Sequence, residues 1–300
     1  MFENKDYELY LGDCLEVMKG IPSKSVDMVL CDLPYGTTKC KWDTVIPMND
    51  YININNKNIE KDEFYLQQFM KGLSKKEIDK IWKENKQEGL WTHYNRIVKD
   101  NGVIALFGKQ PFTTYLINSN RKMFKYELIW EKDKPTNFAL ANKQPMCYHE
   151  NILIFYKNQP IYNKQMVRRE GKGTWRYEFD ISHENRTIQG TDRKYKGKKE
   201  KSNYDKDFKN PKSILYYDTG KRQQLLHPTQ KPILLCEWLI KTYSNEGDII
   251  LDNCMGSGTT GAGCRNLNRK FIGIELDEKY FNIAKDRIEK ALIDKGDKNE

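Results

Sequence analysis

Long apolar runs, paired cysteines and clustered histidines are all missing from this sequence. The seven cysteines form no C-x-x-C pair, so neither a disulfide framework nor a zinc site is predicted, and most should be small buried residues. The four histidines have no partners at ligand spacing, which argues against a metal site. No apolar run approaches the roughly 20 residues of a membrane span, and the first residues lack a secretory signal pattern. We therefore expect a cytoplasmic protein without a membrane partner.

Positive charge is concentrated in the middle of the 300-residue chain, which is long enough for one large α/β domain and a smaller one. Residues 157–226 hold 18 Lys and Arg against 9 Asp and Glu, whereas the two flanking parts are nearly balanced. Aromatic residues such as Trp175 are interleaved with these charges. Basic side chains neutralise phosphates and aromatic rings stack on bases, so the segment predicts a polyanion-binding insert. A solvated basic loop region with a minor core of its own is the alternative.

Short apolar segments alternate with amphipathic helical segments along both flanks of the basic insert. This alternation is typical of βα units and predicts a mostly parallel sheet. The expected strands are residues 9–11, 26–30, 103–107, 128–130, 152–156, 248–251 and 270–274.

Helix signals mark the segments between these strands. Ser74 and Glu77 form a capping-box pattern that opens a helical segment, and Gly89 is expected to interrupt it. Pro232 begins another helix, and the last helix turns Ala284 and its apolar neighbours inward. Residues 47–63 are rich in Asn, Asp and Lys, so we expect a mobile connection there.

A glycine-rich turn provides the first chemical signal. Residues 256–261 read G-S-G-T-T-G and directly follow the apolar segment 249–252. Such glycines let a strand turn sharply into a helix and let a nucleotide-like ligand approach the backbone. Glu275 ends the next strand, where an acidic residue can bind both ribose hydroxyls. Together these features predict an adenosine-binding site.

A second signal lies at the end of the strand over residues 26–30. Asp32-Leu33-Pro34-Tyr35 places a carboxylate, a rigid turn and an aromatic ring at the strand end, where ligand sites of open α/β sheets lie. The Asp32 carboxylate and the Leu33 carbonyl can accept the two hydrogens of an exocyclic amine, and Tyr35 can stack on the ring. The pattern suits a flat, amino-bearing heterocycle.

These two motifs and a third one, His227-Pro228-Thr229-Gln230-Lys231-Pro232, resemble the amino-group DNA methyltransferases that depend on S-adenosylmethionine. Their order along the chain resembles the circularly permuted beta group, which methylates N6 of adenine or N4 of cytosine. The resemblance implies a Rossmann-like α/β fold with a mostly parallel seven-stranded sheet and a target-recognition insert. It implies a catalytic part over residues 1–156 with a helical or loop insertion at 47–91, recognition by 157–226, and a cofactor-binding part over 227–300.

The resemblance also implies a role for each matched residue. Asp32, Leu33, Pro34 and Tyr35 are expected to hold the target base, and Asp32 also borders the cofactor. Glu275 is expected to bind the cofactor ribose, Asp13 to lie near its adenine, and Thr229 and Lys231 to close over its methionine carboxylate. The methionine part itself should meet Asn253, Gly256, Gly258, Thr259 and Thr260. Two positions depart from the family pattern: Leu33 replaces the usual first proline, and Cys254 stands where phenylalanine is frequent.

The expected reaction is methyl transfer from S-adenosylmethionine to N6 of an adenine flipped out of double-stranded DNA, because Asp opens the target-base motif. N4-cytosine methylation is the alternative, and an NAD-dependent oxidoreductase is a more distant one, although it gives no reason for the Asp32 motif or the basic insert. A non-catalytic DNA-binding module would leave the cofactor motif unused. The resemblance makes a cognate restriction endonuclease a candidate partner and implies a bacterial, phage or plasmid gene and a monomer or homodimer.

Overall fold

A computed structural model of the chain describes residues 6–37, 43–168, 207–219 and 230–291. It divides into two compact units, one formed by Met1–Asn163 with Lys212–Glu300 and the other by Lys164–Pro211. In the described part of the second unit, strands β8 (Val167–Arg168) and β9 (Phe208–Lys209) form an antiparallel pair. Most of the predicted recognition insert, including Trp175, lies outside the described residues, as does Thr229.

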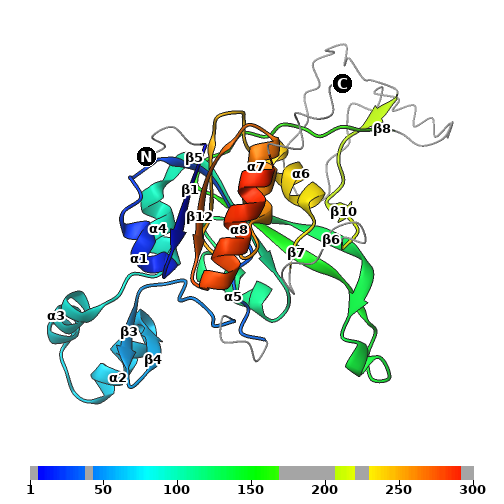
Figure 1. Cartoon of the computed structure of the whole chain (residues 1–300). Coiled ribbons are helices and arrows are strands. Elements are labelled where there is room, and N and C mark those ends of the chain that lie inside the picture. Colours follow the sequence, from blue (N-terminus) through cyan, green and yellow to red (C-terminus); the bar gives the residue numbers. More distant parts are fainter. Residues whose placement is uncertain (1–5, 38–42, 169–206, 220–229, 292–300) are drawn as a thin grey trace, which may run out of the picture. The chain divides into compact units, whose positions relative to one another are not determined.

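The first unit is built on one eight-stranded sheet with the order β1-β12-β11-β2-β5-β7-β6-β10 (Figure 1). Neighbouring strands from β1 to β5 are parallel, β7 is antiparallel to both β5 and β6, and β10 is parallel to β6. The strands are β1 (Tyr7–Leu11), β2 (Val26–Cys31), β5 (Val98–Gly108), β6 (Phe124–Thr136), β7 (Cys147–Tyr156), β10 (Ile214–Tyr216), β11 (Ile249–Asp252) and β12 (Lys270–Glu275).

The α/β architecture and the mostly parallel sheet were predicted correctly, but the number of strands was not. The eighth strand is β10, whose three residues fall in the segment that the charge pattern assigned to the insert. Strand β10 has three residues, and only Leu215 among them is buried. So short a strand shows no apolar period among the basic residues around it. The second compact unit therefore has narrower bounds than the predicted insert at 157–226.

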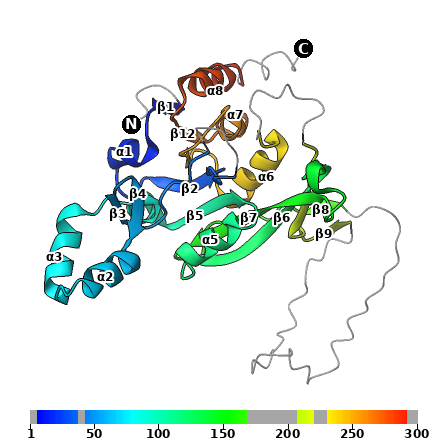
Figure 2. The same cartoon turned by 90° about the horizontal axis from the view of Figure 1, so that it is seen from below.

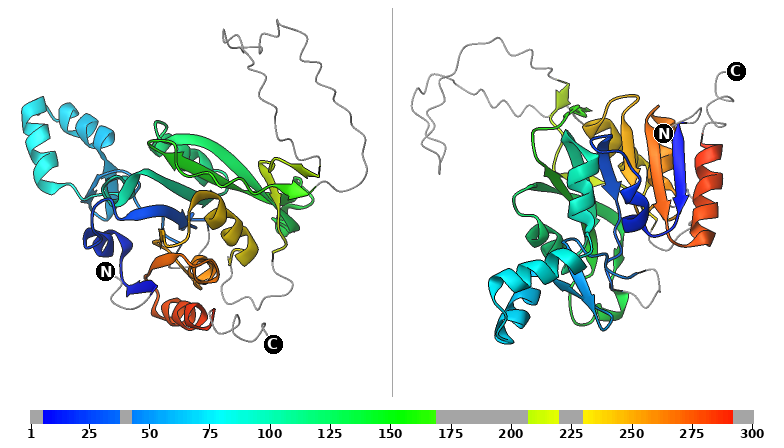
Figure 3. Two further views of the ribbon diagram at one scale, coloured as in Figure 1. Left: turned by 90° about the horizontal axis from the view of Figure 1, so that it is seen from above. Right: turned by 90° about the vertical axis from the view of Figure 1, so that its left-hand side faces the viewer.

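Helices cover both faces of the sheet (Figures 2 and 3). Alternate residues of each central strand point to opposite faces, as β2 illustrates: Val29 and Cys31 belong to one core cluster, and Met28 and Leu30 belong to the other. The first face is covered by α1 (Cys14–Lys19), α4 (Leu90–Ile97) and α5 (Phe112–Ser119), and the second by α6 (Ile233–Tyr243), α7 (Thr259–Asn266) and α8 (Glu278–Lys290).

Residues 51–85 form a small lobe with a core of its own, where a mobile connection and a helical segment were expected. Strands β3 (Tyr51–Ile54) and β4 (Lys57–Glu60) make an antiparallel hairpin that is followed by α2 (Lys61–Met70) and α3 (Lys75–Asn85). Asn55 and Asn56 both adopt positive φ, at 52° and 64°, which is the conformation that a two-residue hairpin turn requires. The lobe's buried residues are Ile52, Ile59, Phe64, Ile78 and Trp82.

Two of the predicted helix boundaries are confirmed. Ser74 caps α3, and the side chain of Glu77 returns the bond to the Ser74 backbone, which completes a capping box. Gly89 lies between α3 and α4 and is the N-cap of α4. Glycine is needed there because a Cβ would lie 2.3 Å from the Asn49 carbonyl oxygen. Among the described residues, no helix is long and apolar enough to cross a membrane, and no group of three His, Cys, Asp or Glu side chains is arranged to hold a metal ion.

Candidate functional site: a cavity at the carboxyl ends of the parallel strands

A cavity of about 850 Å³ lies where the parallel strands end. Strands β11 and β2 are neighbours in the sheet. The chain continues from β11 to β12 on one side of this pair, and from β2 to β5 on the other side. Such a reversal of strand order opens a crevice at the strand ends of α/β folds. The end of β1 contributes Asp13, β2 contributes Asp32, β11 contributes Asp252 and Asn253, and β12 contributes Glu275 to the cavity wall. The volume is within the range for small-molecule sites.

The glycine loop is held in shape by hydrogen bonds and by close packing. Gly256 and Gly258 have positive φ of 51° and 76°. The N–H of Gly256 donates to the Glu275 carboxylate at 2.8 Å, so the loop lies directly against the acidic end of β12. A Cβ on Gly258 would lie 2.9 Å from Cβ of Ala284, because α8 packs against the loop there. Glycine is therefore required at residue 258 for both its φ and its close contact.

Polar side chains fix the rest of this loop. The Arg287 guanidinium from α8 donates to the Thr259 hydroxyl at 2.9 Å. The Tyr94 hydroxyl from α4 donates to the Asn253 side-chain oxygen at 2.6 Å in a fully buried contact. Asp13 caps α1 by accepting from the N–H of Leu15 at 2.7 Å. These bonds leave the loop backbone pre-organised on the cavity wall.

Asp252 is buried beneath the loop. Its carboxylate accepts from the N–H of Cys254 at 3.2 Å and is 4% exposed. Burial raises the pKa of Asp252 to about 7, and the nearby charge of Asp32 adds to this shift, whereas hydrogen bonds from Thr260 and Cys254 oppose it. The Asp252 carboxyl group beneath the glycine loop therefore changes its charge close to neutral pH.

Asp32 and Tyr35 are locked together at the end of β2. The Tyr35 hydroxyl donates to Oδ1 of Asp32 at 2.7 Å, and its ring stacks on Phe112 with centroids 5.1 Å apart. Asp43 accepts from the N–H groups of Gly36 and Thr37 at 2.8 and 2.9 Å, which closes the turn that follows Tyr35. The motif is thus a fixed turn with its carboxylate facing the cavity.

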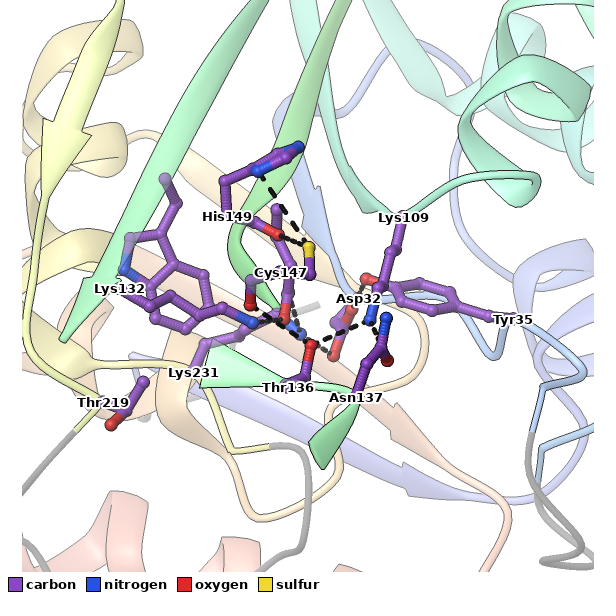
Figure 4. Close-up of polar contacts among 12 residues, drawn as sticks. Asp32, Tyr35, Lys109, Lys132, Thr136, Asn137, Cys147, His149, Thr219 and Lys231 are labelled. Carbon is purple, nitrogen blue, oxygen red and sulfur yellow. Dashed lines mark hydrogen bonds and ion pairs between the residues drawn. The ribbon is translucent and has the colours of Figure 1, made fainter. Parts of the chain in front are cut away.

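A chain of largely buried charges runs from Asp32 at the end of β2 through Lys231 and Glu150 to Lys132 on β6, and Figure 4 labels Asp32, Lys231 and Lys132. The Lys231 ammonium lies 2.5 Å from Oδ2 of Asp32 and 3.2 Å from Oε2 of Glu150. Lys132 binds the other oxygen of Glu150 at 2.9 Å. Two ammonium groups and two carboxylates therefore alternate, and the side chains of Lys132 and Lys231 are only 3% and 9% exposed.

The pKa values within this chain reflect competition between burial and pairing. Burial raises the pKa of Asp32, and Lys231 partly offsets that rise. Burial would raise the pKa of Glu150 as well, but Lys231 and Lys132 outweigh it and hold that pKa below its ordinary value. Burial would lower the pKa of Lys231, but Asp32 and Glu150 outweigh it and raise that pKa. Lys231 and Glu150 are accordingly charged at neutral pH.

The sequence interpretation missed Glu150, Lys132 and Asp43. Glu150 lies near the start of β7 and pairs in register with Trp130, two residues before Lys132 on β6. Because β7 runs antiparallel to β5, its start lies at the same edge of the sheet as the end of β2. The sequence does not show that β7 runs antiparallel to β5, and this direction is what brings Glu150 to the cavity. Asp43 was missed because no sequence motif marks it.

The structure brings almost all predicted residues that it describes to this one cavity. Gly258 is not in the lining, because its contact is with Ala284 behind the loop. Cys254, at the position where the family often has phenylalanine, lines the wall beside Cys14. Lys231 lines the cavity, but its ammonium contacts two carboxylates of this chain. The predicted residues that line the cavity are Asp13, Asp32, Leu33, Pro34, Tyr35, Lys231, Asn253, Gly256, Thr259, Thr260 and Glu275.

Comparison with known proteins agrees with this fold and shows the family. A family model described as DNA methylase matches residues 26–286. The chain is 26% identical over 295 residues to the DNA adenine methyltransferase YhdJ of Escherichia coli, which covers 97% of this chain and 85% of YhdJ. Two solved structures share the fold. The M1.HpyAVI–SAM complex has a TM-score of 0.53 at 21% identity over 94% of this chain and 98% of its own, and the cytosine-N4-specific PvuII DNA methyltransferase has 0.56 at 15% identity over 96% and 93%.

The α/β sheet with a cavity at its strand ends and the match to the family model together place the chain in the methyltransferase class. Because the family model matches most of its length, the chain belongs to the DNA methylase family. It is a DNA methyltransferase, as the sequence motifs predicted.

Asp252 gives the protein a measurable pH dependence of stability. The folded state keeps the Asp252 proton up to about pH 7, whereas the unfolded chain loses it near the ordinary value of 3.8, so the folded state binds more protons between these values. The free energy of unfolding of the wild type should therefore fall, relative to Asp252→Asn, by about 1.4 kcal/mol for each pH unit across this window. Denaturant titrations of both proteins between pH 4 and pH 8 measure the difference, and a constant difference would contradict the burial of an ionisable Asp252.

Glu150→Gln should destabilise the protein, because two buried ammonium groups lose the anion between them. Breaking a buried ion pair on one side costs on the order of 3 kcal/mol, so the midpoint of denaturant unfolding should shift clearly. Glu131→Gln is the matched control, since Glu131 is an exposed carboxylate on the neighbouring strand β6. Equal, small effects of the two substitutions would show that the charge chain contributes nothing to stability.

Proposed function

We propose that this chain transfers a methyl group from S-adenosylmethionine to the N6 amine of an adenine that is flipped out of double-stranded DNA. The observation that carries the proposal is the Asp32 turn. It holds a carboxylate and a neighbouring backbone carbonyl at the edge of a cavity that is also lined by the glycine loop and Glu275. The DNA adenine methyltransferase YhdJ matches nearly the whole chain and supports adenine as the base.

The cavity residues fit an adenosine-type methyl donor at its inner end. Glu275 accepts N–H groups from Gly256 and Asp277, and each carboxylate oxygen keeps a second lone pair for a ribose hydroxyl. The positive φ values of Gly256 and Gly258 let the loop backbone follow a ligand closely. When bound, S-adenosylmethionine supplies an electrophilic methyl group on a sulfonium. We assign its binding to Asp13, Asn253, Gly256, Thr259, Thr260 and Glu275.

Asp32 and Leu33 act on the nucleophile. An exocyclic amine is a poor nucleophile because its lone pair is delocalised into the ring. Two acceptors, the Asp32 carboxylate and the Leu33 carbonyl, bind its two hydrogens and draw the nitrogen towards tetrahedral geometry, which frees the lone pair for attack on the methyl carbon. The nitrogen–carbon bond forms as the carbon–sulfur bond breaks, and the amine then releases its proton to water. The rate gain is positional and electrostatic, with no covalent enzyme intermediate.

Lys231 keeps Asp32 ready for this role. A protonated Asp32 would lose one acceptor, and burial favours that protonated form. The Lys231 ammonium at 2.5 Å opposes this protonation, and the Tyr35 hydroxyl donates to the other oxygen, so the carboxylate is charge-paired and held in one orientation. Lys231 thus acts on the target-base side of the cavity. A contact of Lys231 or Thr229 with the methionine carboxylate remains a prediction.

N4-cytosine methylation is the second candidate function. Its support is the fold shared with the cytosine-N4-specific PvuII enzyme, and the two acceptors at Asp32 and Leu33 suit either exocyclic amine. A cognate restriction endonuclease and a monomer or homodimer are proposed from the resemblance alone. The base is decided by nucleoside mass spectrometry of DNA from cells that express the chain: N6-methyladenine supports the proposal, and N4-methylcytosine replaces it by the alternative.

Asp32→Ala should abolish methyl transfer and leave cofactor binding within a few fold, because it removes an acceptor for the amine and no contact of the glycine loop. Transfer is measured with labelled S-adenosylmethionine on DNA, and cofactor binding by calorimetry. Asp62→Ala, an exposed carboxylate of α2, is the control and should retain full activity. Undiminished methylation by Asp32→Ala would remove the base-holding role of the turn.

A further inference from the structure

The hairpin between β6 and β7 ends in an exposed apolar tip. Phe138 is 69% exposed and Leu140 is 40% exposed, and both belong to the short 3-10 helix η1 (Phe138–Leu140). The tip is well formed: Asn137 enters it with φ of 72°, and backbone N–H groups of Leu140 and Ala141 donate to Asn137 and Phe138 at 2.9 and 3.1 Å. A single exposed ring is ordinary on a protein surface, so what this ring can contact depends on where the turn lies.

This tip adjoins the cavity. The residues just before it, Lys134, Pro135 and Thr136, line the cavity that contains Asp32. Lys109, at the end of β5, ties the hairpin down by donating to Thr136 at 2.9 Å and to Asn137 at 3.3 Å (Figure 4). Phe138 therefore stands two residues beyond Thr136, a fixed part of the cavity wall.

The tip itself carries groups that can contact a nucleic acid. These are Lys134 and Lys143 and the amides of Asn137, Asn142 and Gln144, while the acidic residues Glu131, Asp133 and Glu150 lie on the strands behind the tip. A second exposed apolar surface lies on α2, where Phe69 is 70% exposed, but α2 contributes no residue to the cavity and opens with two acidic residues. Among the described residues, the β6–β7 tip joins an exposed phenylalanine ring and two lysines to a segment that lines the cavity.

We infer that Phe138 enters duplex DNA beside the target base and fills the gap that the flipped base leaves in the stack. The inference rests on the proposed function, because the gap exists only if a base moves into the cavity. Flipping costs a few kcal/mol of lost stacking and pairing. Apolar side chains inserted between base steps offset such costs, and an aromatic ring stacks on the bases on both sides. Leu140 and the lysines hold the tip on the groove edge and the phosphates.

The experiment compares two duplexes that differ only in what lies opposite the target adenine. One carries thymine there, and the other carries an abasic nucleotide, so its target is already unpaired. The target sequence is taken from sequencing of modified DNA. Methyl transfer to each duplex is measured in a single turnover for the wild type, Phe138→Ala, Phe138→Trp and Phe69→Ala. Phe69 is as exposed as Phe138 and lies away from the cavity lining, which makes it the matched control.

Phe138→Ala should slow transfer to the paired target by at least about tenfold, which corresponds to about 1.4 kcal/mol. On the unpaired target its rate should come within about threefold of the wild type, because less stabilisation of the flipped state is needed there. Phe138→Trp should retain the rate on both duplexes, and Phe69→Ala should change neither. Cofactor affinity and melting temperature should be unchanged in all variants, since both rings are exposed.

An equal loss on both duplexes, or no loss on either, would overturn the role of Phe138 in filling the stack. If the wild type transfers no methyl group to either duplex, the proposed function itself fails and the inference fails with it. The wild-type rate therefore separates the two failures.

Discussion

Placing a carboxylate in the wall of this cavity creates a problem that the rest of the site depends on. Burial drives Asp32 towards its protonated form, which would leave it a poorer acceptor. The structure places a lysine on one oxygen and a tyrosine hydroxyl on the other. Lys231 is itself buried, so it needs a second anion, Glu150, and Glu150 is shared with Lys132. Each member of the chain offsets the desolvation of the next.

The sheet topology makes this arrangement possible. Parallel strands bring their carboxyl ends to one edge, which places Asp32, Asp252 and Glu275 around one cavity. The hairpin β6–β7 then enters the same sheet with β7 reversed, so the start of β7 delivers Glu150 to that edge. The cavity depends on which strands are neighbours in the sheet and not on their order in the chain. It is therefore lined by both motifs, although the glycine loop follows the Asp32 turn in the sequence. The same hairpin continues past the cavity to Phe138. It therefore supplies Lys132 and Glu150 to the charge chain and also carries the exposed tip.

The sequence predicted those parts of the fold that are encoded locally. The strand before Asp32, the glycine loop after β11, the capping box at Ser74 and the break at Gly89 all have short-range signals of hydrophobic period or backbone conformation. The β3–β4 hairpin was missed because its turn is Asn55-Asn56, without the glycine that marks such turns, in a segment that otherwise reads as polar. The three-residue strand β10 was too short to show a period. Glu150 and Lys132 were missed because their meeting depends on the register and direction of strands far apart in sequence.

A double-mutant cycle between Asp32 and Lys231 tests the central claim most directly, namely that these two groups form one buried charge pair on the target-base side. The free energy of unfolding is measured at neutral pH for the wild type, Asp32→Asn, Lys231→Met and the double variant. The coupling energy from these four values isolates the pair from the other effects of each substitution. The account predicts a coupling of at least about 2 kcal/mol, as expected for a buried pair whose partner would be left unpaired. A coupling below about 0.5 kcal/mol, the level of an exposed surface pair, would contradict it.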